Sequence, residues 1–473
     1  MAGVEGRPLR VALVGSGPAG MYAAGHLLEG PAGTYADGRL VDLVDRPVEV
    51  DVFDRLPTPW GLVRGGVAPD HPDKKLVAKI FEATAARPGF RFFGNVEVGR
   101  EIRHGDLTEW YDAVIYAVGA AGDRRLGIPG EDLRGCWSAR EFVAWYNGHP
   151  DFSHLPFDLS CERAVIVGNG NVALDVARVL ALDVDALRTT DVADHALEAL
   201  GASAIREIVI LGRRDPSHAA FNNPELDELA DLPTADVIVD PADLPGEHQL
   251  ALAAADWTAL RKIQTLGRIA GRTPVGRSRR IVLRFFTSPI GLVGSNRIES
   301  VLVARTELDR GPDGRLVVRA TDDKTVIHAG LAFRAVGYSG AAIPGLPFDE
   351  GRGVMPNSDG RVIQRDEVLA GTYVAGWIKR GPSGIIGTNK KCARDTVRSL
   401  IADADAGRLP TASTLSANVV ADLVRARQPA VVTFAGWKAI DRHERDAGKV
   451  AGRPRVKQTS IQRMVELAQG GMR

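Results

Sequence analysis

The sequence predicts an α/β protein made of two Rossmann-like dinucleotide-binding domains, with the second inserted into the first. Two stretches each run from an apolar strand through a glycine turn into a helix: RVALVGSGPAGMYAAGHLL at 10–28 and RAVIVGNGNVALDVARVLAL at 163–182. Strands that alternate with helices favour parallel sheets. A third observation is a repeated strand end, because YDAVIYAVGA at 111–120 is echoed by LAFRAVGYSG at 331–340.

The repeated strand ends indicate where the chain leaves the first domain and where it returns. We therefore predict a discontinuous first domain from residues 1–121 and 342–473, which includes a C-terminal extension, and an inserted second domain from residues 122–341. Further strands are expected at VEVDVFD, EIVILGRR and GTYVAGW, from their apolar and β-branched content. The stretch 30–47 resembles a loop insertion, and 183–204 resembles an extra helical insertion.

Composition excludes several classes of function. Apolar residues make up 45% and charged residues 25% of the 473, and the 59 basic residues balance the 59 acidic ones. This balance gives no sign of a general affinity for nucleic acid or membranes. The three cysteines form no CxxC pair, so we expect neither a metal site nor a redox dithiol. No apolar stretch reaches the roughly 20 residues of a membrane span, and no signal peptide is visible, so we expect a cytoplasmic protein.

The first glycine motif is Gly15-Ser16-Gly17-Pro18-Ala19-Gly20. Gly15 permits a tight turn, Gly17 lets a pyrophosphate approach the backbone, and Gly20 lets helix and strand pack closely. An acid at the end of the second strand should then bind ribose hydroxyls, and Asp54 stands there. The insertion at 30–47 accounts for its long spacing. A solvated acid at a strand end is the alternative interpretation of Asp54.

The second glycine motif, GNGNVA at 168–173, has alanine in the place of the third glycine, as the fingerprint permits. The following strand ends in Arg213 and Arg214 rather than in an acid. Arginine binds a phosphate with two parallel hydrogen bonds, so this site should prefer NADP(H) to NAD(H). An exposed basic turn is the alternative. The two different strand ends predict FAD at the first site and NADPH at the second.

Several ordered segments resemble the adrenodoxin reductase-type ferredoxin–NADP+ reductases. They are LPTPWGLVRGGVAPDHPDKK at 56–75, IVGNGNVALDVARVL, GRR, NNPEL, RFFTSP, the opening stretch, and GWKAIDRHERDAGKVAGRPRVK at 436–457. The resemblance covers nearly the whole chain. It implies a two-domain flavoprotein that takes hydride from NADPH onto FAD and passes single electrons to a small iron–sulfur protein. Supply of cytochrome P450s is one of several downstream routes that stay open.

The resemblance also implies site residues, position by position. Contacts to FAD are expected from Ala19, Asp54, Leu62, Val98, Trp377, Gly384, Ile385 and Ile386. The turn that meets the NADP pyrophosphate should be Asn169, Gly170, Asn171 and Val172, with Arg213 and Arg214 on the 2′-phosphate. The family usually has glutamate where Asp54 stands, and often phenylalanine where Trp60 stands.

His71 and Glu225 match a histidine near the flavin and a glutamate near the nicotinamide. Hydride transfer needs no protein nucleophile, because the cofactors carry the chemistry. We expect these two residues to handle the accompanying proton and to help align the rings. A histidine between two prolines is otherwise most often a fixed turn residue.

The stretch AGWIKRGPSGIIGTNKK at 375–391 has tryptophan where many flavoproteins have an aspartate. The resemblance places Trp377 against FAD and Gly384 where the nicotinamide arrives. We expect a helix to begin near Gly384 and to point its positive end at the charge that a reduced flavin carries. The alternative is that Trp377 only fills the core.

Between Arg261 and Arg284 there are eight basic residues and no acid. Ferredoxins of this class are acidic, so we expect a docking face that includes Arg261, Lys262 and Arg268. A solvated basic segment is the alternative, and nothing indicates nucleic-acid binding. We expect a monomer. Outside this function, an NADP(H)-binding flavoprotein sensor and an oxidoreductase with another acceptor stay open, whereas a thiol-disulfide reductase lacks its dithiol.

Overall fold

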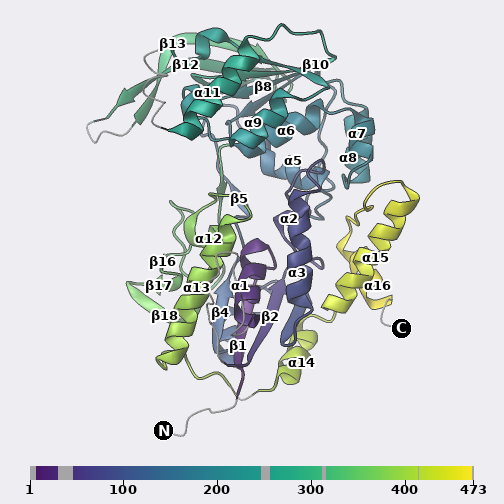
Figure 1. Cartoon of the computed structure of the whole chain (residues 1–473), viewed down its shortest axis with the longest axis vertical. Helices are drawn as coiled ribbons and strands as arrows, with labels where there is room; N and C mark the ends of the chain where they lie inside the picture. The colour runs from purple at the N-terminus through teal and green to yellow at the C-terminus, as the bar shows by residue number, and fades with distance from the viewer. Residues whose placement is uncertain (1–6, 30–45, 247–255, 312–315, 414, 471–473) are drawn as a thin grey trace.

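The computed structural model describes residues 7–29, 46–246, 256–311, 316–413 and 415–470. Two lobes stand one above the other, each with a parallel sheet flanked by helices (Figure 1). The chain passes between the lobes beside a short antiparallel pair, β5 (Gly122–Asp123) with β15 (Tyr338–Ser339). No helix in these ranges is long and apolar enough to cross a membrane.

The first sheet joins strands from both ends of the chain. Its order is β16 (Asn357–Ser358), β17 (Arg361–Gln364), β18 (Glu367–Val374), β4 (Ala113–Tyr116), β1 (Leu9–Val14), β2 (Val48–Asp54) and β3 (Phe90–Gly94). Strands β18 to β3 are parallel. The chain runs outward from β1 to β3 and then returns to β4 on the other side, so the carboxyl end of β1 lies at a topological switch point.

Residue alternation along β1 explains how this sheet is covered on both faces. Val11 and Leu13 pack in a core with α1 (Pro18–Leu28) and α13 (Thr388–Asp405). Ala12 and Val14 pack on the other face with α4 (His104–Trp110) and α14 (Ala417–Arg427). A strand buried on both faces reads as the continuous apolar run LRVALV.

The second sheet repeats the same logic. Its order is β6 (Cys136–Ser138), β14 (Leu331–Arg334), β7 (Arg163–Val167), β8 (Glu207–Leu211), β10 (Arg279–Arg284) and β9 (Ala235–Val239). One face packs on α5 (Ala139–Tyr146), α6 (Asn171–Ala181), α9 (Asn223–Ala230) and α11 (Trp257–Ala270). The other is covered by the antiparallel strands β11 (Thr287–Val293), β12 (Ser300–Arg310) and β13 (Leu316–His328). Again β7 lies between β8 and β14, at a switch point.

Short helices connect these layers, and the C-terminal helices extend the lower lobe. The connecting elements are α2 (Leu62–Gly65), the 3-10 turns at Lys74–Val77, Pro216–His218 and Pro241–Asp243, α3 (Ala78–Ala85) and α12 (Trp377–Arg380). Helices α15 (Phe434–Val450) and α16 (Ile461–Gly470) pack through Trp437, Ile440 and Met464 on Phe81 of α3. In Figure 1 they stand beside the lower lobe and reach up towards α7 and α8.

Most predicted elements are confirmed, with one error. The expected helical insertion at 183–204 contains α7 (Val184–Arg188) and α8 (Asp194–Gly201). The expected loop insertion at 30–47 lies almost wholly outside the described residues. The helix expected near Gly384 was placed wrongly, because α13 begins at Thr388 and residues 381–387 form a loop after α12. The exact domain boundaries stay a prediction.

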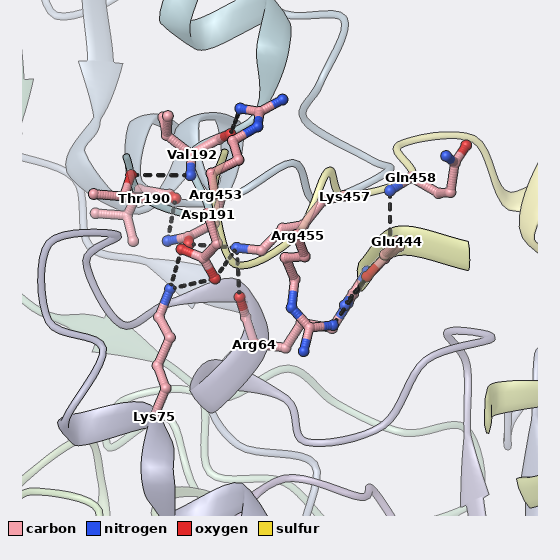
Figure 2. Close-up of polar contacts among 12 residues, drawn as sticks. Arg64, Lys75, Thr190, Asp191, Val192, Glu444, Arg453, Arg455, Lys457 and Gln458 are labelled. Atoms are coloured by element: carbon pink, nitrogen blue, oxygen red, sulfur yellow. Dashed lines mark hydrogen bonds and ion pairs between the residues drawn. The ribbon is translucent and has the colours of Figure 1, made fainter. Parts of the chain in front are cut away.

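A buried polar network joins the two lobes through the segment between α15 and α16. Asp191, from the loop before α8, pairs with Lys75 of the lower lobe and with Lys457. The Lys457 ammonium also donates to the Arg64 carbonyl oxygen and to the side-chain oxygen of Asn147 (Figure 2). The C-terminal segment therefore contacts both lobes at once.

Candidate nucleotide sites at the domain junction

The first glycine turn is built for close approach of the backbone. Gly15 has a φ of +102°, and a Cβ there would lie 2.6 Å from the Ala117 carbonyl oxygen at the end of β4. A Cβ on Gly20 would lie 2.0 Å from the Gly15 carbonyl oxygen. At Gly17, by contrast, the nearest atom to such a Cβ is 3.9 Å away. The backbone is thus tightly packed at Gly15 and Gly20, where helix and strand meet. It is open at Gly17, where a phosphate is expected.

Asp54 holds this turn in place. Its Oδ2 accepts hydrogen bonds from the backbone N–H of Ser16 at 2.9 Å and from the Ser16 hydroxyl. Its Oδ1 accepts from the Leu56 N–H at 2.9 Å. The acid therefore stands beside the glycine turn, as expected for a ribose ligand, and also shapes the turn, which the sequence pattern alone did not indicate.

The second glycine turn has the same construction. Gly168 has a φ of +112°, and a Cβ there would lie 2.3 Å from the Ala335 carbonyl oxygen at the end of β14. The side-chain oxygen of Asn171 accepts from the Asn222 N–H at 2.8 Å, which fixes the start of α6 against the loop before α9. The predicted residues Asn169, Gly170, Asn171 and Val172 thus lie together at the N-terminus of α6, where an anion is favoured.

Arg213 and Arg214 follow β8 at the same edge of the sheet. Within the described residues, the Arg214 Nε is buried without a hydrogen-bond partner. A buried, unpaired guanidinium nitrogen is costly unless a ligand accepts from it. The pair thus fits the expected 2′-phosphate.

The stretch after β18 carries a second orphaned donor. The Trp377 ring stacks on Tyr338 at 5.7 Å between centroids, and its Nε1 is buried without a partner. Gly384 has a φ of +80°, and a Cβ there would lie 2.6 Å from the Thr388 hydroxyl oxygen. Glycine is thus required by the local backbone. A tryptophan that only filled the core would normally have its N–H satisfied.

The apolar side chains expected at FAD differ in burial. Leu62 is 45% exposed and Ile385 is 59% exposed, which suits contact with an apolar ring. Ile386 is half-buried against the core around Trp60, and Val98 is half-buried beside the core of the first sheet. Ala19 is buried at the start of α1.

His71 contacts a glutamate that the sequence motifs did not single out. Its Nε2 lies 2.8 Å from Oε2 of Glu228, whereas Glu225 lies one helical turn earlier on α9. Oε1 of Glu225 is 3.6 Å from Lys74 Nζ, and its Oε2 is buried without a hydrogen-bond partner. Both acids stand on the face of α9 at the domain junction, because i and i+3 are neighbours on a helix. That spacing was the available signal for Glu228.

Comparisons with known proteins agree with this geometry. Residues 9–210 match the model of the pyridine nucleotide-disulphide oxidoreductase family. The NADPH-ferredoxin reductase FprA of Mycobacterium tuberculosis is 48% identical over 98% of this chain and 100% of its own. Its solved structure in complex with NADPH superimposes with a TM-score of 0.90. The mitochondrial NADPH:adrenodoxin oxidoreductase of Arabidopsis thaliana is 38% identical over 95% of this chain and 93% of its own.

The chain belongs to the NADPH-ferredoxin reductases of the adrenodoxin reductase type. The resemblance inferred from the motifs is therefore confirmed, as are the α/β fold and the two parallel sheets.

In this reductase, residues 261–284 do not form the uncompensated basic surface that the sequence indicated. Lys262 is only 6% exposed, and its Nζ donates to the Ala219 carbonyl oxygen beneath α11. Its inclusion in the docking face was wrong, because the apolar stem of the side chain is buried under α11 and the ammonium donates to a backbone carbonyl there rather than facing solvent. Arg261 and Arg268 lie on the outside of α11, but both pair with Asp227 of α9, at 2.6 and 3.6 Å.

The acids that balance this stretch come from elsewhere in the chain. Arg272 pairs with Asp231, and Arg280 pairs with Glu207. Arg279 donates to the carbonyl oxygens of Leu180 and Leu182. Counting charges along the chain overstated the positive field, because folding brings α9 and β8 beside the stretch.

Proposed function

We propose that the protein is an FAD-dependent NADPH-ferredoxin reductase, which takes hydride from NADPH onto FAD and passes single electrons to a ferredoxin-like iron–sulfur protein. One observation carries the proposal: two glycine turns lie at the switch points of two separate sheets, where β2 ends in Asp54 and Arg213-Arg214 follow β8. Its support is the 48% identity to an NADPH-ferredoxin reductase over nearly the full length of both chains.

The residues present fit both cofactors. The lower lobe, with residues 1–121 and 342–473 as the proposed domain, offers the first glycine turn, Asp54 and the orphaned Trp377 N–H to FAD. The upper lobe, residues 122–341, offers the start of α6 and the buried Arg214 Nε to NADPH. When bound, the nicotinamide and the flavin supply the hydride donor and acceptor. The chain's task is to hold the two rings together and to exclude water.

His71 and Glu228 can hold or release a proton at the domain junction. His71 is 4% exposed, and the hydrogen bond from its Nε2 to Glu228 joins a loop of the lower lobe to α9 of the upper lobe. The burial of the imidazole shields a proton held at this nitrogen from bulk water. The half-exposed Glu228 connects that proton to solvent. We propose that this pair serves the proton relay expected of His71.

Replacing His71 or Glu228 by glutamine should slow flavin reduction by NADPH about ten-fold, the rate equivalent of one lost hydrogen bond. FAD should stay bound, because neither residue belongs to the first glycine turn. The double variant should be no slower than either single one, since both act through one hydrogen bond. Stopped-flow loss of flavin absorbance measures the rate.

Glu225→Gln provides the matched control on the same helix. It is not bonded to His71, so its effect on the rate should add to that of His71→Gln. Unchanged rates in His71→Gln and Glu228→Gln would contradict the proposed relay. Additive effects of the two substitutions would show that His71 and Glu228 act independently.

The function itself is tested with the purified holoenzyme. We expect yellow protein that bleaches with NADPH in the absence of oxygen and reduces cytochrome c only weakly until a ferredoxin is added. A colourless protein that cannot be reconstituted with FAD would favour a sensor. A flavin that bleaches but passes no electrons to any of a panel of ferredoxins would indicate another acceptor.

For the partner, we propose an acidic ferredoxin that docks near the outer face of α11. Reversing charge at Arg261 and Arg268 together should raise the ferredoxin KM about ten-fold at low salt and flatten its dependence on ionic strength. Arg310→Glu, at the end of β12, is the control for a general change in surface charge. An unchanged KM would place docking elsewhere. The monomeric state and cytoplasmic location expected from the sequence stay predictions.

A further inference from the structure

Arg178 lies beside His71 at the junction of the two lobes, and its guanidinium makes several polar contacts there. It comes from α6 of the upper lobe and its side chain is 3% exposed. Its Nε lies 2.5 Å from Oδ2 of Asp70, the residue before His71, and its Nη2 lies 2.7 Å from Oδ1 of Asp175. The same Nη2 lies 3.3 Å from the Nδ1 of His71.

The guanidinium stays charged in this place. Burial alone would lower the pKa of Arg178, but its hydrogen bond to Asp70 and the charge of Asp175 outweigh burial and raise the pKa above its ordinary value. An arginine nitrogen can only donate. The Nδ1 of His71, facing this donor, must therefore act as the acceptor.

A second cation supports the same assignment. Lys74 Nζ lies 3.2 Å from the same Nδ1, and an ammonium can also only donate. With Nδ1 accepting, the ring proton of neutral His71 lies on Nε2, where Oε2 of Glu228 accepts it at 2.8 Å. The Nδ1 side of the ring thus faces hydrogen-bond donors, and the Nε2 side faces an acceptor.

We propose that Arg178 is a positioning residue for His71: it fixes the imidazole as the tautomer with its proton on Nε2 and ties that ring to α6. This inference rests on the relay proposed for His71 and Glu228, and extends it to a residue that contacts the imidazole at Nδ1. Removing the guanidinium leaves Asp175 on the Nδ1 side of the ring, with its Oδ1 4.0 Å from Nδ1. That acid favours a proton on Nδ1 and so the loss of the assigned tautomer.

The test uses the FAD-loaded enzyme labelled with ¹⁵N-histidine, in which the His71 signals among the 10 histidines are found by their loss in His71→Gln. In the parent enzyme we expect an unprotonated, pyridine-type Nδ1 and a protonated Nε2. In Arg178→Gln we expect the Nδ1 signal to move towards the protonated position. Lys74→Gln is the matched control, since it removes the other donor, whose side chain is 36% exposed, and should move the signal less.

Kinetics supply the second readout. Arg178→Gln should slow flavin reduction about ten-fold, and the double variant with His71→Gln should be no slower than the slower single variant. An Nδ1 signal that does not move, or rate effects that add, would overturn the proposal. If His71→Gln itself leaves the rate unchanged, the relay fails, while the nitrogen signals still decide whether Arg178 sets the tautomer.

A variant that retains more of the cluster guards against a failure to fold. Asp70→Asn replaces the carboxylate that anchors Arg178 with a neutral amide and leaves the guanidinium in the chain. We expect its Nδ1 signal to shift in the same direction as in Arg178→Gln, by a smaller amount. No shift in a folded Asp70→Asn variant would count against the anchoring of Arg178 as the cause.

Discussion

Replacing Arg214 by glutamine is expected to raise the Kd for NADPH about 100-fold and to leave the Kd for NADH nearly unchanged. A hydrogen bond between charged groups contributes about 1.5–3 kcal/mol, which is roughly ten-fold to more than 100-fold in affinity. The Arg214 Nε is buried and has no partner in the described chain, so the ligand's 2′-phosphate is its expected acceptor. Equilibrium titration of the holoenzyme with the two coenzymes measures the difference.

Arg213→Gln is the comparison for this prediction. Arg213 is exposed, whereas Arg214 is half-buried. The loss of Arg213 should therefore cost less affinity for NADPH, because water screens its charge more strongly. A variant at Arg214 that weakens NADH and NADPH equally would point to damage of the turn rather than loss of phosphate recognition. A variant that weakens neither would remove Arg214 from the site.

Replacing Asp191 by asparagine is expected to destabilise the protein by about 3–5 kcal/mol, the usual cost of breaking a buried ion pair. Asp191 lies between the ammonium groups of Lys75 and Lys457, at 2.6 and 3.1 Å (Figure 2). Its loss leaves two buried cations facing each other. For a lobe of about 200 residues, this cost corresponds to a fall of about 10 °C in the apparent Tm. Thermal unfolding followed by circular dichroism measures it.

The same network predicts acid sensitivity. Burial alone would raise the pKa of Asp191, but the charges of Lys457 and Lys75 outweigh burial and hold it below its ordinary value. The native pKa is thus lower than the unfolded one, so the stabilisation is complete above the unfolded value of about 4 and is lost as pH falls below it. The Tm difference between parent and Asp191→Asn should therefore shrink in acid.

An exposed pair in the same region is the control. Lys449 and Asp446 pair at 2.8 Å on the surface of α15, with both side chains more than half exposed. Lys449→Gln should leave the Tm unchanged within error, because solvent screens such pairs. An Asp191→Asn variant as stable as this control would show that the junction depends on other contacts.

Local patterns predicted the scaffold well because they express local physics. Each strand buried on both faces reads as an apolar run, and each glycine turn has a steric reason visible in the order of residues. The limits of α13 were less predictable. A glycine-rich loop such as residues 381–387 permits several starting points, and in the folded chain α13 begins at Thr388.

Polar partners were harder to predict, because they depend on which elements meet. Glu225 and Glu228 are both acidic and lie one turn apart, and only the position of α9 against the lower lobe brings Glu228 to His71. In the same way, Lys262 was expected on the surface, but the packing of α11 turns it towards the Ala219 carbonyl.

The α/β class and the two nucleotide turns could be predicted from the order of residues alone, since glycine geometry, strand burial and strand-end charges act over a few residues. The resemblance to the ferredoxin reductases could be inferred from the matching segments. Which charges pair depends instead on the tertiary structure. Asp227 pairs with Arg261 on α11, Arg178 contacts His71, and Lys457 pairs with Asp191. These contacts join residues more than 30 positions apart, and their energies depend on distance and burial that only the folded chain sets.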